Sequence, residues 1–186
     1  MEDEVAKKIY GTSVERCEKL VANTLKRNPT VHFLREALDK AGCSTGSNFF
    51  KVEECEQKVA GGFQSDKGVV ICSNRVGFQQ EVDAILAHEL IHAYDHCRAR
   101  NLDWTNCEHH ACSEIRAANL SGDCRFKQEF NRGNFGVQKH QQVCVRRRAN
   151  LSVAMNPHCS KAEAASAVDR VWNTCYRDTR PFERAP

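Results

Sequence analysis

Two histidines and a glutamate within five residues have the types and spacing of a metal-dependent hydrolytic site. The run His88-Glu89-Leu90-Ile91-His92 is the His-Glu-x-x-His pattern of zinc peptidases. Side chains four residues apart lie on one face of a helix with Cβ atoms ~5–6 Å apart, so both imidazoles can bind one ion. The pattern therefore predicts His88 and His92 as metal ligands, with Glu89 beside them as the group that takes a proton from the attacking water.

A catalytic zinc site needs a third protein ligand from another element. His96 lies eight residues beyond His88, ~12 Å along a helix axis, which is too far for both to bind one ion. Glu114 lies in the next predicted helix, 22 residues after His92, and its small neighbours Ala111, Ala117 and Ala118 allow close packing. This is the arrangement of zincins whose third ligand is a glutamate on a second helix. We predict Glu114 as the third ligand of one zinc ion per chain.

Other roles for the nearby residues stay open. His109 and His110 are the next candidates for the third ligand, in which case Glu114 is a surface residue paired with Arg116 or Arg125. The segment 107–112, with two cysteines and two histidines, is an alternative structural zinc site, although it lacks a partner pair at the usual spacing.

A catalytic zinc site also needs a side chain that orients a ligand imidazole and a donor that stabilises the oxyanion of the substrate. We expect Asp95 to orient a ligand imidazole. Tyr94, His109 and His110 are candidate donors to the oxyanion that develops during hydrolysis.

Helical periodicity predicts the elements that carry these residues. The best-supported helix runs from about Gln80 to Arg98, without an internal proline or glycine. Capping and breaking residues predict the other helices over about 14–27, 30–41, 106–120, 137–153 and 160–175, the last opened by a Ser160/Glu163 capping box, and a loop or frayed tail over 178–186.

Short apolar runs at 49–52, 59–63 and 69–72 predict strands of a small sheet built from hairpins, with residues 65–68 as a turn. We expect an extended substrate to pair with an edge strand, Val69–Cys72. The fold class predicted is α+β, a compact zincin-like (gluzincin-type) metalloprotease with a small β-sheet, an active-site helix and C-terminal helices.

Length and composition predict one globular domain. The chain has 186 residues, of which 41% are hydrophobic and 27% charged, and a net charge of +3, which is too small to mark a nucleic-acid binder. No apolar run reaches the ~20 residues of a membrane span, and Met1–Glu4 lacks the form of a targeting signal. We divide a single metallopeptidase domain into an N-terminal helix (1–29), a catalytic core (30–124), a basic helical region (125–178) and a tail (179–186).

Charge is uneven along this order. Residues 125–186 hold 12 Lys and Arg against 5 Asp and Glu. Arg146, Arg147 and Arg148 lie within a predicted helix, where they form either a solvated basic face or a surface for an anionic membrane or nucleic acid.

Eleven cysteines do not fit a plain cytosolic protein. At most five disulfides can form and one thiol is left over; the alternative is a set of buried free thiols. Because Cys97, Cys107, Cys112 and Cys124 flank the two predicted ligand helices, we expect disulfides to hold these helices in fixed relation and so to make the zinc site rigid.

Two blocks of sequence carry a resemblance to a known family. The blocks are His-Glu-Leu-Ile-His-Ala-Tyr-Asp-His-Cys-Arg at 88–98 and Ala-Cys-Ser-Glu-Ile-Arg-Ala-Ala-Asn-Leu-Ser-Gly-Asp-Cys at 111–124. They resemble the mitochondrial inner-membrane metalloproteases that mature a subunit of the ATP synthase, a family also labelled Ku-binding proteins. The likeness covers most of the chain from about residue 30 onward.

The resemblance implies a zinc endopeptidase of the mitochondrial intermembrane space, peripheral on the inner membrane. Its implied partners are polypeptides: the precursor of ATP synthase subunit 6 (subunit a), whose presequence it removes and whose assembly it assists, and other intermembrane-space proteins. Motif match assigns His88 and His92 as zinc ligands and Glu89 as catalytic. The alternatives are a mainly non-proteolytic ATP synthase assembly factor and a Ku-associated nuclear DNA-repair protein.

Overall fold

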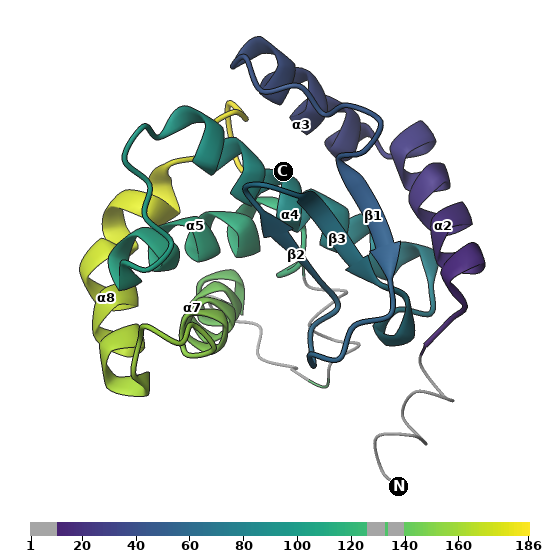
Figure 1. Ribbon diagram of the computed structural model, residues 1–186. Helices are drawn as coiled ribbons and strands as arrows, with labels where there is room; N and C mark the ends of the chain where they lie inside the picture. Colours follow the sequence, from purple (N-terminus) through teal and green to yellow (C-terminus); the bar gives the residue numbers. More distant parts are fainter. Residues whose placement is uncertain (1–10, 126–132, 134–139) are drawn as a thin grey trace, which may run out of the picture. The chain divides into compact units, whose positions relative to one another are not determined.

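The computed structural model describes residues 11–125, 133 and 140–186 (Figure 1). The chain divides into two compact units, Met1–Arg98 and Ala99–Pro186. The prediction of one peptidase domain over the whole chain stays a prediction.

The described part of the first unit, residues 11–98, contains helices, a small sheet and a 3-10 turn. Its elements are α2 (Val14–Arg27), α3 (Pro29–Lys40), β1 (Phe50–Glu53), β2 (Gly61–Gln64), β3 (Gly68–Cys72), η1 (Ser73–Arg75) and α4 (Gln79–Arg98). The second unit is helical in its described part, with α5 (Cys107–Leu120), α7 (His140–Val153) and α8 (Lys161–Arg177). The mixture confirms the predicted α+β class, and the predicted start of one helix at Val137 lies outside the described residues.

Helix ends follow the capping residues. The Asn28 side chain accepts hydrogen bonds from the backbone N–H groups of Thr30 and Val31, and Pro29 fills the first position of α3, where no N–H donor is needed. Gly42 has φ +87°, the left-handed conformation that ends a helix, just after α3. Asn28 and Pro29 thus confirm the predicted break between α2 and α3, and Gly42 confirms the predicted end of α3.

The sheet differs from the prediction in its pairing. Its strand order is β1-β3-β2, with β1 parallel and β2 antiparallel to β3. Strands β2 and β3 form the predicted hairpin. Strand β1 does not pair with β2, which follows it in sequence, but with β3, so the connection from β1 to β2 crosses over the central strand. The prediction of Val69–Cys72 as an edge strand for substrate was wrong, since β3 is the central strand and all five of its residues are buried.

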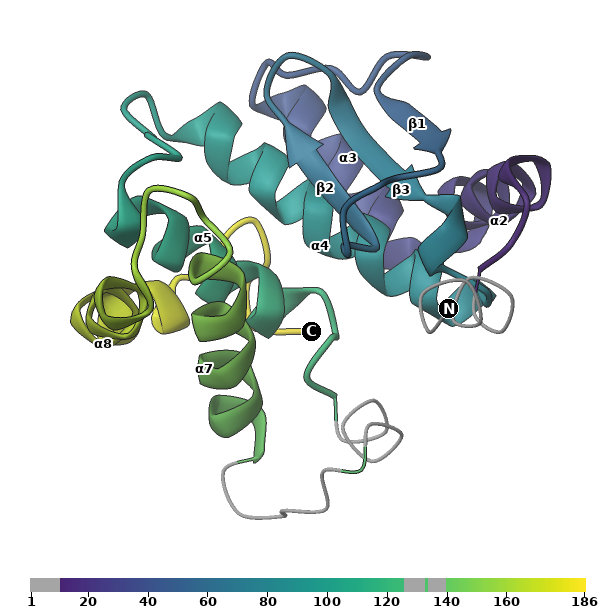
Figure 2. The same cartoon turned by 60° about the horizontal axis from the view of Figure 1, so that its bottom comes forward.

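Helix α4 is the element around which the first unit packs. It contacts α2, α3, β2 and β3, and Figure 2 shows it running along one face of the sheet. Strand β2 approaches it closely at Gly61, where a Cβ atom would lie 2.8 Å from the Ile85 side chain and 2.9 Å from the Val70 carbonyl oxygen. A glycine is therefore required at this contact.

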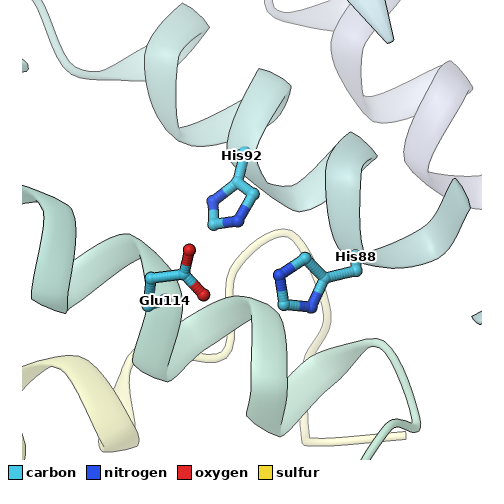
Figure 3. Close-up of side chains that lie close together, drawn as sticks. All are labelled: His88, His92 and Glu114. Carbon is cyan, nitrogen blue, oxygen red and sulfur yellow. The ribbon is translucent and has the colours of Figure 1, made fainter. Parts of the chain in front are cut away.

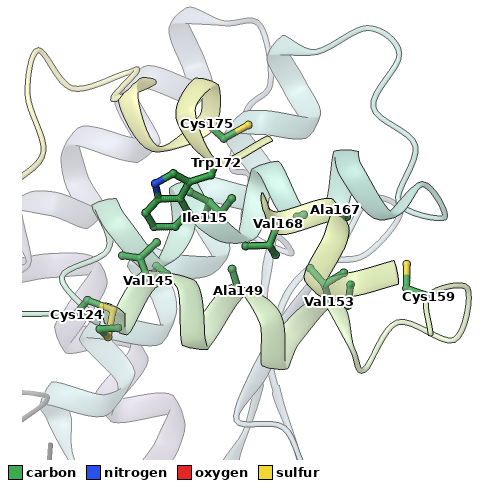
Figure 4. Close-up of a cluster of buried hydrophobic side chains, with 14 residues drawn as sticks. Ile115, Cys124, Val145, Ala149, Val153, Cys159, Ala167, Val168, Trp172 and Cys175 are labelled. Atoms are coloured by element: carbon green, nitrogen blue, oxygen red, sulfur yellow. A yellow bond between two sulfur atoms is a disulfide. The ribbon is translucent and has the colours of Figure 1, made fainter. Parts of the chain in front are cut away.

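Helix α5 packs against both α7 and α8 in the second unit. Their shared core is made mainly of small side chains, alanines and cysteines, with Ile115 and Trp172 as its largest members (Figure 4). The predicted capping box at the start of α8 is confirmed: Ser160 and Glu163 exchange side-chain to backbone hydrogen bonds of 2.9 and 3.2 Å.

The C-terminal segment, predicted as a loop or frayed tail, is a loop held to α5. The guanidinium of Arg116, which is fully buried, donates to the backbone carbonyls of Asp178 and Arg180. It also lies 3.0 Å from the Asp178 carboxylate. Buried charge requires such partners, so this arginine fixes the segment.

Ten of the eleven cysteines form five disulfides, and the remaining Cys17 is buried. The pairs are Cys43–Cys97, Cys55–Cys72, Cys107–Cys159, Cys112–Cys175 and Cys124–Cys144. Five pairs with one thiol left over reach the predicted maximum, and the alternative of a set of buried free thiols was wrong. The expectation that disulfides hold the two ligand-bearing helices in fixed relation was also wrong, because no pair joins α4 to α5. Cys97 pairs with Cys43, in the segment after α3, whereas the three bonds near α5 join cysteines of its own unit.

The basic run on α7 is largely engaged in structural contacts. Arg146 pairs with Asp169 of α8, and its guanidinium lies 4.0 Å from the centre of the Trp172 ring. Arg148 lies 2.6 Å from the Asp123 carboxylate. These contacts weaken the interpretation of the run as a free basic surface. Across the described residues, no helix combines the length and apolar character that crossing a bilayer requires.

Candidate metallopeptidase site

His88 and His92 project from the same side of α4, as their four-residue spacing requires (Figure 3). Their ring centres are 4.8 Å apart, and ligand nitrogens of the two rings lie within 4.8 Å of each other. His92 is 6% exposed and Glu89, next to His88, is 8% exposed. The predicted helix is confirmed, and it provides two convergent imidazoles with a buried carboxylate beside them.

Both ends of α4 are fixed within its unit. At its start, the Gln79 side chain donates to the Thr24 hydroxyl at 2.8 Å, and the same hydroxyl donates to the Asp83 carboxylate at 2.6 Å. At its end, the Cys43–Cys97 disulfide ties the last turn to the segment after α3. Leu86 and Leu90 are fully buried between these ends. The histidines therefore lie on a helix held at both ends.

Asp95 and Tyr94 both lie in the last turns of α4 and both contact Arg98. Asp95 is 3% exposed, and its carboxylate accepts a hydrogen bond from the Arg98 guanidinium at 3.0 Å. That guanidinium lies 5.7 Å from the centre of the Tyr94 ring. The roles expected for these residues, imidazole orientation and oxyanion donation, stay predictions.

Glu114 lies in the middle of α5 and is 6% exposed. Asn106 caps the start of helix α5, and its side chain accepts from the N–H groups of Glu108 and His109 at 2.9 and 3.2 Å. At this exposure Glu114 is not the surface residue of the alternative interpretation.

A hydrogen-bond chain holds one oxygen of this carboxylate. Glu114 Oε1 lies 3.3 Å from Nε2 of His110, one turn earlier on α5. His110 Nδ1 lies 3.0 Å from the side-chain nitrogen of Asn156, which also donates to the Trp104 carbonyl at 2.8 Å. The Asn156 oxygen accepts from the His158 N–H at 3.0 Å, which fixes the orientation of the amide.

This chain assigns the tautomer of His110. An amide nitrogen only donates, so Nδ1 of His110 accepts, and Nε2 carries the proton donated to Glu114. Asn156 is the residue that sequence reasoning missed, since it lies 46 positions from His110 and no motif connects them. The arrangement resembles the outer hydrogen bonds that orient ligating groups in metal sites.

The remaining candidates are arranged differently. His109 is exposed, and its Nδ1 accepts from the Asp103 N–H at 3.1 Å. The alternative of a structural zinc site at 107–112 was wrong, because Cys107 and Cys112 are both oxidised in disulfides. Thiolates are needed to bind zinc.

Comparison with known proteins identifies the class of protein. The model of the Peptidase M76 family matches residues 15–183. The chain is 44% identical to the human mitochondrial inner membrane protease ATP23 homolog over 180 residues, which cover 95% of this chain and 73% of that protein. It is 40% identical to mitochondrial inner membrane protease atp23 of Schizosaccharomyces pombe over 91% of this chain and 92% of that protein.

A third relative, mitochondrial inner membrane protease ATP23 of Saccharomyces cerevisiae, is 44% identical over 86% of this chain and 74% of its own length. No solved structure matches. The matches define a peptidase class, consistent with the helix that bears His88 and His92. The chain belongs to the Peptidase M76 family.

Proposed function

We propose that the protein is a zinc-dependent endopeptidase of the mitochondrial intermembrane space, peripheral on the inner membrane. The observation that carries this proposal is α4, which presents two imidazoles and a buried glutamate in a chain of a peptidase family. The zincin-like character of the fold and the metalloendopeptidase class are parts of the same proposal.

Three residues would hold the ion: His88, His92 and Glu114. Two imidazole nitrogens and one carboxylate oxygen form the ligand set of many catalytic zinc sites, so the residues fit this metal. Figure 3 shows the side chains of these three residues, which we propose as the zinc ligands. His110 would then orient Glu114 through the Nε2–H donor already described.

The chemistry divides between the ion and the protein. Zinc, when bound, polarises the scissile carbonyl and makes water more acidic. Glu89 takes the proton of the attacking water and passes it to the leaving amine. Asp95 orients an imidazole, and Tyr94, His109 and His110 stay candidate donors to the oxyanion, although His110 already donates to Glu114.

Two observations support the compartment. The relatives are named mitochondrial inner membrane proteases, and five disulfides suit an oxidising space rather than the nucleus or cytosol. The substrate proposed from the family resemblance is the presequence of ATP synthase subunit 6, with a further role in assembly of the membrane sector.

Metal removal tests the proposal. We expect the purified protein to cleave the subunit 6 precursor at its presequence, to lose this activity on chelation and to regain it with one zinc per chain. Glu114→Ala should lower zinc occupancy. The control Glu108→Ala makes the same substitution at a partly exposed position of the same helix and should leave zinc occupancy unchanged. Cleavage that survives complete removal of metal would contradict the proposal.

Thiol alkylation tests the compartment. Burial raises the pKa of the Cys17 thiol to about 11, so this cysteine should resist alkylation until the protein unfolds. We expect freshly isolated, non-reduced protein to take up a single alkyl group after unfolding. Eleven alkylated cysteines would favour the nuclear alternative.

A further inference from the structure

A cavity of about 390 Å³ opens in the first unit, beside the C-terminal half of α4. Its apolar lining comes from Leu38, Phe49, Phe63 and Ala93, and His96 adds a third ring. The ring centres of Phe49 and Phe63 are 6.5 Å apart, and those of Phe63 and His96 are 5.7 Å apart. The rings thus form one side of a largely apolar hollow.

Apart from His96, the polar residues of the lining are exposed, so they form the rim of the cavity; Ser44 and Asn48 are two of them. Ser65, Asp66 and Lys67 belong to the turn between β2 and β3 and are exposed. The Cys43–Cys97 disulfide forms another part of the wall and joins α4 to the segment after α3. A covalent bond in the wall favours a cavity of fixed shape.

The position of the cavity along α4 connects it to the catalytic residue. Glu89, Ala93 and His96 follow one another at the four- and three-residue spacings that place side chains on one stripe of a helix. At 1.5 Å per residue, Ala93 and His96 lie ~6 and ~10 Å beyond Glu89 along the axis. An extended polypeptide covers these distances in about two or three residues, at ~3.3 Å each.

We propose that this cavity is a specificity subsite for a large apolar side chain of the polypeptide substrate, such as Leu, Met or Phe. The side chain would lie two or three residues from the scissile bond, on one side of it. Burial of apolar surface against the rings favours such an occupant, whereas a charged side chain placed there would lose its hydration. The charged groups of the lining, Asp66 and Lys67, belong to the exposed turn between β2 and β3. The inference rests on the proposed peptidase function.

Cleavage-site profiling tests the subsite. The zinc-loaded protein is incubated with a library of peptides from a digested proteome, and the cleaved bonds are read by mass spectrometry. We expect Leu, Met and Phe to be enriched over Ala by about ten-fold at a single position two or three residues from the cleaved bond. Ser65→Trp places a large side chain at the exposed rim and should reduce this enrichment at least five-fold.

Asp66→Trp is a second rim variant, and Gln57→Trp, at an exposed site outside the cavity, is the matched control that should retain the wild-type profile. Thermal unfolding shows that each variant is folded. Cleavage without apolar enrichment, or enrichment unaffected by both rim variants, would overturn the subsite and leave the proposed peptidase function intact. If the wild-type protein cleaves nothing, the peptidase function fails and the subsite with it.

Discussion

The two units differ in the side chains that form their cores and in the number of disulfides that stabilise them. The first buries large aliphatic side chains, among them Leu34, Leu86 and Leu90, and it has two disulfides. The core of the second consists mostly of alanines and cysteines, and it has three disulfides. Because small side chains bury little apolar surface, the second unit depends more on its cross-links.

The distribution of the disulfides between the two units corrects the sequence-based prediction that they hold the two ligand helices in fixed relation. Each of the two helices with predicted ligands is cross-linked within its own unit: α4 through Cys97, and α5 through Cys107 and Cys112. Oxidation therefore stabilises each helix separately. None of the five disulfides joins α4 to α5, so these bonds do not make the predicted zinc site rigid by linking one ligand helix to the other.

The largest expected effect comes from breaking a cross-link of the second unit. The Cys112–Cys175 bond closes a loop of 63 residues, and its loss through Cys112→Ser with Cys175→Ser should cost about 4 kcal/mol in the chain-entropy model. Hydrogen exchange should show lost amide protection in α5 and α8, while α4 and β3 stay protected.

The matched change in the first unit is Cys55→Ser with Cys72→Ser, which opens a loop of 17 residues. It should cost about 3 kcal/mol and act on β3 instead. If both double variants lost protection in the same helices and strands, the two units would not be separately stabilised.

Arg116→Met should have the next largest effect. It removes a fully buried guanidinium and leaves the Asp178 carboxylate and two carbonyls without their donor. The free energy of unfolding should fall by about 3 kcal/mol, measured by urea denaturation. The exposed Arg170→Met, which removes a surface pair with Glu108, should change it by less than about 1 kcal/mol.

Asn156→Leu should act on metal binding more than on folding. Without the amide donor, the proton of His110 is no longer directed to Glu114, and zinc affinity should fall by about 10- to 100-fold in a competition titration. Asn150→Leu, on α7, serves as a control for the chemical change. If both variants bound zinc with the affinity of the wild type, the hydrogen-bond chain from Asn156 through His110 to Glu114 would have no role in zinc binding.

The smallest effect is expected at the start of α8. Hydrogen bonds from Ser160 lower the pKa of Glu163, so their contribution to stability is present above the ordinary carboxyl pKa and is lost as the pH falls through the lowered value. Ser160→Ala should raise that pKa towards its ordinary range in an NMR titration and lower stability by about 1 kcal/mol at neutral pH. An unchanged Glu163 titration would show that the Ser160 hydroxyl does not contribute to the lowered pKa.

Local signals were sufficient for much of this fold. The break at Asn28-Pro29, the glycines that follow helix ends at Gly42 and Gly122, and the capping box at Ser160 are short-range features. They predicted helix boundaries to within a residue or two, although the structure begins α3 at Pro29 with Asn28 as its cap, where the sequence predicted a start at residue 30. The site helix was equally readable, since the spacing of His88 and His92 and the apolar stripe of the helix lie in one segment.

Long-range pairing could not be read in the same way. The parallel contact of β1 with β3 and the five disulfide partners join segments 17 to 63 residues apart, and no local pattern encodes them. The partner of His110 was missed for the same reason. A basic run such as Arg146–Arg148 likewise reveals its partners only when Asp169 and Asp123 are placed beside it.

The most direct measurement concerns Glu89, the buried carboxylate beside the two histidines. Glu89→Gln keeps the size and burial of the side chain but removes its ability to take a proton. We predict that this variant binds one zinc per chain with near wild-type affinity and loses cleavage of the subunit 6 precursor by at least ~100-fold. Undiminished cleavage by the zinc-loaded variant would contradict the assignment of Glu89 and the hydrolytic mechanism built on it.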